Sequence, residues 1–237
     1  RASKERVVLG MMDKKDIIYN MKTYSFCIIE NYWDKEQCDT ALKQFLNLSR
    51  DVFETGQGGD LRCQFTNSHC RSAFDFLKDD DPYVASLANF IMESSMQVIS
   101  SLNEKQWISK YMKEGAPTPT LEINESWYHV TRHAGAHGTH SHGNCSWCGI
   151  YYVDGGEKDK GGKNVFLKPF SFHYSDPGTD CFKSNQYHQT PHEGLLVVFP
   201  SYLLHSAEPY LGEDKERIVV AVNMKIILEG DNDGEEK

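Results

Sequence analysis

The fold of this chain is decided by the stretch Leu195-Leu-Val-Val-Phe-Pro-Ser-Tyr-Leu-Leu-His205. Its first five residues form an unbroken apolar run that ends at a proline, which is typical of a core strand. Working outward, four more short segments of β-rich composition occupy the second half of the chain, and turns rich in Gly, Asp and Lys separate them. Several short strands with such turns between them predict a β-sandwich or barrel. The four segments are residues 121–132, 148–153, 164–168 and 217–227.

The first half of the chain has a different, partly helical pattern. Residues 24–30 predict a strand, and apolar residues then recur at helical spacing within 34–54 and again from Val84 to Leu102. We therefore expect a mainly β protein with flanking helices. Residues 171–194 form a long polar insertion, and loops of that length often serve a function. The expected organisation is an N-terminal extension over 1–22, one domain over 23–228 with helical support at 34–115 and a β core at 120–228, and a disordered acidic tail over 229–237.

Composition narrows the classes of function. The 237 residues carry 25 Lys and Arg against 34 Asp and Glu, a net charge of −9, which argues against a nucleic-acid backbone or an anionic membrane surface as partner. No apolar run reaches the roughly 20 residues of a membrane-spanning helix. The chain has seven cysteines, an odd number, and no apolar signal segment at its start. We therefore expect a reducing, intracellular setting, with the cytoplasm favoured over an organelle.

Histidines cluster within a short part of the chain. Ten are present, and five of them fall within residues 129–142. Neutral imidazole is the commonest metal ligand in proteins. In an extended segment His140 and His142 point the same way, and His205, just beyond the apolar strand, is the best candidate for a third ligand. Three ligands on one face leave coordination positions open, as non-haem iron chemistry requires. Surface or hydrogen-bonded histidines are the alternative interpretation. The five clustered histidines are His129, His133, His137, His140 and His142.

A second kind of metal site competes for the same histidines. His140 and His142 are followed by Cys145 and Cys148 in the pattern H-x-H-x2-C-x2-C, which offers four ligands to a structural zinc ion. The pattern lacks the usual loop between two ligand pairs, and it leaves His205 without a role. A redox function for Cys145-Ser-Trp-Cys148 is weaker, because no strand–motif–helix context surrounds the two cysteines.

Arg217 begins the almost wholly apolar segment Arg217-Ile-Val-Val-Ala-Val-Asn223. A guanidinium at the head of a buried strand needs a carboxylate partner. That partner is either an acidic side chain such as Glu208 or a dicarboxylate cosubstrate held by two parallel hydrogen bonds. The residues themselves leave both interpretations open.

Four of these segments, taken in order, resemble the 2-oxoglutarate/Fe(II)-dependent oxygenases. The likeness is closest to a branch with the pattern W…H-x-H…SGVYY…FPSxLxH…RIxxxFN, and it covers about residues 120–225. The family implies a double-stranded β-helix, which is a jelly-roll, cupin-like barrel with the iron in its mouth. The matching segments are Trp127 with His140-Ser-His142, then Gly149-Ile-Tyr-Tyr-Val153, then Phe199-Pro-Ser-Tyr-Leu-Leu-His205-Ser-Ala-Glu-Pro209, and Arg217-Ile-Val-Val-Ala-Val-Asn223.

The resemblance assigns roles to individual residues. His140 and His205 match the two histidine ligands, and His142 stands where most members have the carboxylate of H-x-D/E. An empty third position would admit a halide, but such sites carry a small residue there. Arg217 matches the residue that pairs with the distal carboxylate of 2-oxoglutarate, although Val219 stands where the family has the Ser of R-x-S. Tyr151 and His129 match positions that contact the cosubstrate, and Trp127, Trp147 and Tyr152 are candidates for the substrate pocket.

The activity that this resemblance implies is that of a dioxygenase using Fe(II) and 2-oxoglutarate. It would hydroxylate a small molecule, amino acid or peptide and release succinate and CO2, with no nucleic-acid or membrane partner. Two alternatives remain open at this point. One is a three-histidine cupin-type metalloenzyme that does not use 2-oxoglutarate, and the other is a zinc-stabilised binding module.

Overall fold

The computed structural model describes residues 82–167 and 186–229, Leu77, and three short strands of backbone at 18–20, 28–32 and 70–74. Several sequence-based expectations therefore lie outside the described residues. These are the extension over 1–22 apart from its one short strand, the helix predicted within 34–54, most of the insertion over 171–194, and the tail beyond 229.

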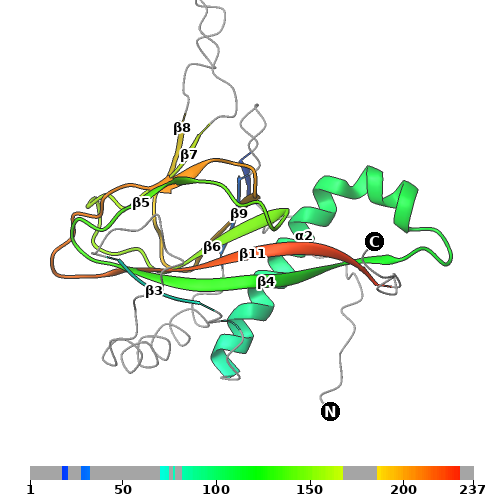
Figure 1. The fold of residues 1–237 in the computed structure, drawn as a ribbon, viewed down its shortest axis with the longest axis horizontal. Helices are drawn as coiled ribbons and strands as arrows, with labels where there is room; N and C mark the ends of the chain where they lie inside the picture. The colour runs from blue at the N-terminus through cyan, green and yellow to red at the C-terminus, as the bar shows by residue number, and fades with distance from the viewer. Residues whose placement is uncertain are drawn as a thin grey trace, which may run out of the picture.

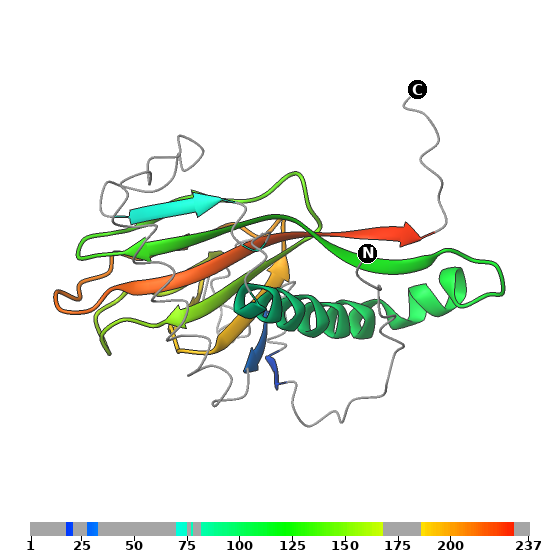
Figure 2. The ribbon, with the colours of Figure 1, turned by 90° about the horizontal axis from the view of Figure 1, so that it is seen from below.

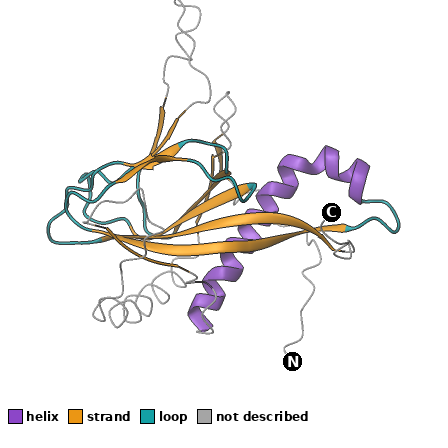
Figure 3. Ribbon diagram, viewed as in Figure 1, coloured by secondary structure: helices purple, strands orange, loops and turns teal. Residues whose placement is uncertain are grey.

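Two antiparallel sheets make up most of the described structure (Figures 1 and 3). The larger sheet has the strand order β1-β2-β9-β6-β11-β4-β3, and the smaller one has the order β5-β10-β7-β8. The strands are β1 (Ile18–Asn20), β2 (Ile28–Tyr32), β3 (Cys70–Phe74), β4 (Thr118–Thr131), β5 (His137–His140), β6 (Trp147–Asp154), β7 (Asn164–Leu167), β8 (Gln186–Gln189), β9 (Leu195–Pro200), β10 (His205–Ala207) and β11 (Arg217–Glu229).

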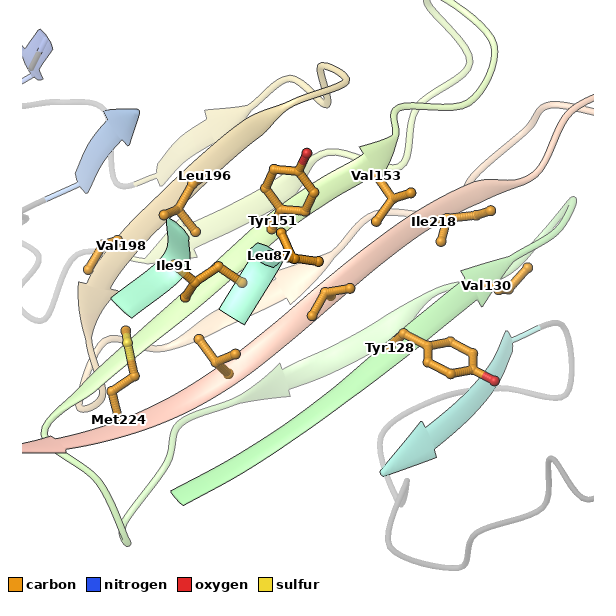
Figure 4. Packing of buried hydrophobic residues seen from close by; sticks show 12 residues of the cluster. Leu87, Ile91, Tyr128, Val130, Tyr151, Val153, Leu196, Val198, Ile218 and Met224 are labelled. Carbon is orange, nitrogen blue, oxygen red and sulfur yellow. The ribbon is translucent and has the colours of Figure 1, made fainter. Parts of the chain in front are cut away.

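One long helix, α2 (Pro82–Tyr111), lies across the outer face of the larger sheet (Figure 2). Leu87 and Ile91, which are four residues and about one turn apart on the same face of the helix, pack against Leu196 and neighbouring side chains of the sheet (Figure 4). The helix predicted from Val84 to Leu102 is confirmed. No helix in the described part of the chain combines the length and the apolar character that crossing a membrane requires.

The inner face of the larger sheet packs against the smaller sheet. Ile150, Tyr152, Val197 and Phe199 of the larger sheet share a buried cluster with Phe166 of β7. Because neighbouring strand residues point to opposite faces, their sequence neighbours face α2 instead. Strands β6 and β9 are thus buried on both faces, which explains why they read as unbroken apolar runs. Two antiparallel sheets around a shared core are the arrangement of a jelly roll, so the predicted mainly β class is confirmed.

Candidate metal centre

Three of the predicted ligands meet at one end of the smaller sheet. His140 is the last residue of β5, and it stands directly opposite His205, the first residue of β10, in the antiparallel register. Their ring centroids are 4.3 Å apart, and the ring of His142 lies 5.0 Å from His140 and 5.3 Å from His205. One potential ligand atom from each residue lies within 4.8 Å of the other two. Residues more than 60 positions apart are therefore brought together by strand pairing.

Burial keeps these imidazoles neutral. Removal from water lowers the pKa of His205 to about 3 and that of His142 to about 4, and it also lowers the pKa of His140. Each charged ring would also repel the others. A neutral imidazole has a nitrogen lone pair available for a metal ion, whereas an imidazolium has none.

Backbone carbonyls select the nitrogen that faces the cluster. The Nδ1 atom of His140 lies 2.9 Å from the carbonyl oxygen of Gly138, and the Nδ1 atom of His205 lies 2.9 Å from that of Leu203. A carbonyl oxygen only accepts, so in the neutral rings Nδ1 carries the hydrogen and Nε2 keeps the lone pair. Such a second bond orients metal-binding histidines in many proteins.

The three imidazoles fit a transition metal, and the alternative zinc site that would include two cysteines is not formed. Imidazole nitrogens suit iron, nickel, copper and zinc. Within the described residues, the His140, His142 and His205 group is the one convergent set of three or more potential ligands. Cys145 and Cys148 do not join it, and their sulfur atoms lie 3.7 Å from each other instead. The mixed zinc site considered from the sequence is therefore not formed.

The three histidines line a cavity, and the buried side chain of Arg217 lines the same cavity. Arg217 is 3% exposed, and its Nη2 atom donates a hydrogen bond of 2.7 Å to Oδ1 of Asn164. Its guanidinium carbon lies 5.4 Å from the ring centroid of Tyr152, and the hydroxyl of Tyr152 donates to the same Asn164 oxygen at 2.5 Å. Glu208, the acidic partner considered from the sequence, contacts Nδ1 of His188 at 2.8 Å.

A glycine makes room for this arginine. Gly162 has a φ of 69°, a conformation that other residues rarely adopt. A Cβ atom at this position would lie 2.9 Å from Cδ of Arg217. Asn164 and Gly162 were both missed by sequence reasoning. The polar residue at the start of the apolar segment Asn164-Val-Phe-Leu167 was the available signal for the first of them.

Two further histidines complete the cavity wall. Nε1 of Trp127 donates to Nε2 of His129 at 2.8 Å, so the neutral ring of His129 carries its hydrogen on Nδ1. Burial, with the charge of Arg217 and the nearby His140 as smaller causes, lowers the pKa of His129 to about 3. The ring of His137 stacks on that of His140 with centroids 4.4 Å apart, a role that sequence reasoning did not foresee.

The comparisons with known proteins agree with this geometry. Residues 125–223 match a family model described as "Putative 2OG-Fe(II) oxygenase", and this range contains the three clustered histidines and Arg217. Residues 125–223 thus match the 2-oxoglutarate/Fe(II)-dependent oxygenases. The family uses Fe(II) and 2-oxoglutarate, so the protein is an oxidoreductase.

Solved structures share the fold of this oxygenase at low sequence identity. A prolyl-4-hydroxylase from Pseudomonas putida superposes with a TM-score of 0.54 at 12% identity, covering 86% of this chain and 93% of that one. The carbocyclase SnoK from nogalamycin biosynthesis gives 0.53 at 12% identity over 89% and 85% of the two chains. HygX from Streptomyces hygroscopicus, with nickel, 2-oxoglutarate and hygromycin B bound, gives 0.50 at 12% identity over 86% and 83%. A comparison with curated proteins found no match. The double-stranded β-helix predicted from the sequence is confirmed.

Not every predicted site residue of the oxygenase reaches the cavity. Tyr151 lies on the face of β6 that packs against α2, where its ring centroid is 6.0 Å from that of Phe90. Trp147 packs against the same cluster. Tyr152 faces the opposite way and contacts Asn164, as described above. Side chains alternate between the two faces of β6, and Tyr151 and Trp147 lie on the face toward α2. The expectation that these two residues line the site is therefore wrong.

Proposed function

We propose that this oxygenase is a dioxygenase that couples oxidative decarboxylation of 2-oxoglutarate to hydroxylation of a small molecule, amino acid or peptide. Succinate and CO2 would be the co-products. The observation that carries the proposal is the convergence of three neutral histidines in a cavity that a buried arginine also lines. The proposed oxygenase domain is residues 23–228, with its β core at 120–228 and helical support at 34–115. Residues 1–22 would be an extension and residues 229–237 a disordered acidic tail.

His140, His142 and His205 would hold Fe(II), through Nε2 in the case of His140 and His205. When bound, the metal and 2-oxoglutarate supply the oxidising chemistry, and the protein supplies orientation and a site shielded from water. A third imidazole in place of a carboxylate leaves the protein's own ligands without negative charge. The metal would therefore depend more on the carboxylates of the cosubstrate for charge neutralisation than in a site with an acidic ligand.

Arg217 would bind the distal carboxylate of 2-oxoglutarate. A guanidinium forms two parallel charge-assisted hydrogen bonds with a carboxylate, and these are strongest where water is excluded. Val219 provides no hydroxyl at the position where the family has serine. The hydroxyl of Tyr152 donates its one hydrogen to Asn164, so we assign it the role of orienting Asn164 and, through Asn164, the guanidinium of Arg217.

His129 would donate its Nδ1 hydrogen inside the cavity, toward the cosubstrate. Its tautomer is held by Trp127, and its low pKa keeps it uncharged beside Arg217. Trp127 also lies against the ring of His142, with centroids 5.8 Å apart, so it would form part of the substrate-facing wall. We place the reaction inside the cell, where the thiols of Cys145 and Cys148 are kept reduced in the absence of an oxidant.

An anaerobic titration tests the proposal. Protein loaded with Fe(II) should develop a weak visible charge-transfer band when 2-oxoglutarate is added, and succinate should form once air is admitted. Bound iron with neither band nor succinate would reject the proposal and favour the three-histidine cupin-type enzyme that ignores 2-oxoglutarate. Failure of His140→Ala and His205→Ala to reduce iron binding would reject the metal centre itself.

A further inference from the structure

A pair of cysteines lies beside the metal centre and has no part in the proposed function. Sγ of Cys145 is 3.7 Å from Sγ of Cys148, which is van der Waals contact. Cys145 is half-buried in the turn before β6, whereas Cys148 is 2% exposed within the strand and lines the same cavity as the histidines.

We propose that Cys145 and Cys148 are a redox-active dithiol whose closure into an intramolecular disulfide weakens metal binding at the three histidines. The coupling to the metal rests on the proposed function, whereas disulfide formation does not.

The two thiols differ in the way that a nucleophile and its resolving partner differ. Cys145 is the more accessible one, and its hydrogen-bonding contact with Cys148 lowers its pKa. The same contact, together with burial, raises the pKa of Cys148. Cys145 therefore ionises first, and the thiolate is the reactive form.

The chemistry balances with hydrogen peroxide as the two-electron oxidant. The Cys145 thiolate attacks one peroxide oxygen, the O–O bond breaks, and a sulfenic acid and water result after one proton is taken up. The Cys148 sulfur then attacks the sulfenic sulfur, the S–O bond breaks, and a second water leaves with the thiol proton. Glutathione disulfide reaches the same product by two exchange steps and releases two molecules of glutathione.

Only a small movement is needed for closure. A disulfide has an S–S length of about 2.05 Å, so the sulfurs must approach by about 1.7 Å from their present 3.7 Å. Cys148 is fixed within β6, which is paired with β9 on one side and β11 on the other. Cys145 lies outside any strand, so the movement falls on its turn. Closure also ends the hydrogen bond that Sγ of Cys148 donates to Oδ1 of Asn223 at 3.4 Å.

Ser201 connects this turn to a metal ligand. Its hydroxyl donates to the carbonyl oxygen of Cys145 at 2.7 Å, and its amide donates to that of Ser146 at 3.0 Å. Its own carbonyl accepts the amide hydrogen of His142 at 3.0 Å. A displacement of the turn thus reaches His142 through a single residue. Because coupling between two equilibria is reciprocal, a bound metal should in turn favour the dithiol.

The test separates disulfide formation from its effect on the metal. Metal-free protein is treated with hydrogen peroxide, the peroxide is removed, and the cysteines are mapped by alkylation and mass spectrometry before Ni(II) is titrated calorimetrically. We expect the peptide with residues 145–148 to lose two hydrogens and two alkylation sites, and Ni(II) affinity to fall about 10-fold, as for other outer-shell changes. Dithiothreitol should restore both.

Variants decide the outcome. Cys145→Ser and Cys148→Ser should each keep their Ni(II) affinity after peroxide, whereas Cys70→Ser, on β3, should respond like the parent. Two free thiols after peroxide, or a disulfide to a different cysteine, would overturn the proposal. A disulfide between Cys145 and Cys148 with unchanged Ni(II) affinity would overturn the coupling. Reduced protein that binds no Ni(II) would instead count against the proposed metal centre, and the thiol mapping would still decide whether the pair closes.

Discussion

Replacing Arg217 by glutamine tests the cosubstrate site most sharply. Arg217 is 3% exposed, and its side chain already donates to Asn164, a bond that a glutamine amide can partly reproduce. The variant therefore removes the positive charge and leaves a shorter, neutral side chain that still carries an amide donor. Two hydrogen bonds to a charged group contribute about 1.5–3 kcal/mol each, and one neutral replacement returns about 1 kcal/mol. A net loss of about 3 kcal/mol raises the Kd for 2-oxoglutarate roughly 100-fold or more.

The assay is calorimetric titration of 2-oxoglutarate into Ni(II)-loaded protein, with Ni(II) affinity and Tm measured separately. Arg132→Gln is the matched control, because Arg132 is exposed and pairs with Glu216 away from the histidines. The control should bind 2-oxoglutarate as the parent does. If Arg217→Gln folds, binds Ni(II) and keeps its 2-oxoglutarate affinity within about threefold, Arg217 is a structural residue and the reasoning from its burial is refuted.

Three further predictions concern other groups of the cavity. Tyr152→Phe should raise the Kd for 2-oxoglutarate about 10-fold, because Asn164 and, through it, Arg217 lose the hydroxyl that orients them. Tyr151→Phe, on the opposite face of β6, should leave the Kd unchanged, and equal effects of the two variants in calorimetry would contradict the assignment. Metal-free protein should lose stability as pH falls from about 6.5 toward 4. The cause is that His129 and His205 have pKa values of about 3 in the folded state, below those of the unfolded chain, so protons bind the unfolded chain first. Together the two histidines should lower the free energy of unfolding by about 2–3 kcal/mol per pH unit. Urea unfolding at several pH values measures this slope, and a flat profile would show that these rings are not buried and neutral. His142→Asp should retain metal binding and shift preference toward Mn(II), measured by competition with Ni(II); complete loss of binding would show that the third imidazole is specifically required.

The sequence was most informative where residue types are chemically specific. The H-x-H pair and His205 predicted a three-histidine cluster, and strand pairing of β5 with β10 brings these residues together. The unbroken apolar run of β9 predicted a core strand. The strand is apolar throughout because both of its faces are buried. His133, a fifth member of the histidine cluster in the sequence, is exposed, so density alone did not separate cavity residues from surface residues.

The sequence was least informative about which way side chains face. Strand β6 is apolar on both sides, so no alternation distinguished Tyr151 from Tyr152. Strand β10 has three residues and an irregular pairing with β5, and so short a segment has no readable period. The role of Asn164 depends on the register of β7 beside β10, which is a tertiary property and has no local signature.

Anomalous diffraction from crystals soaked with Mn(II) and 2-oxoglutarate tests the central claim most directly. The account predicts a single metal peak bound by His140, His142 and His205, with the distal carboxylate of 2-oxoglutarate on the guanidinium of Arg217. A metal peak at Cys145 and Cys148, or a metal at the histidines with 2-oxoglutarate bound away from Arg217, would contradict it.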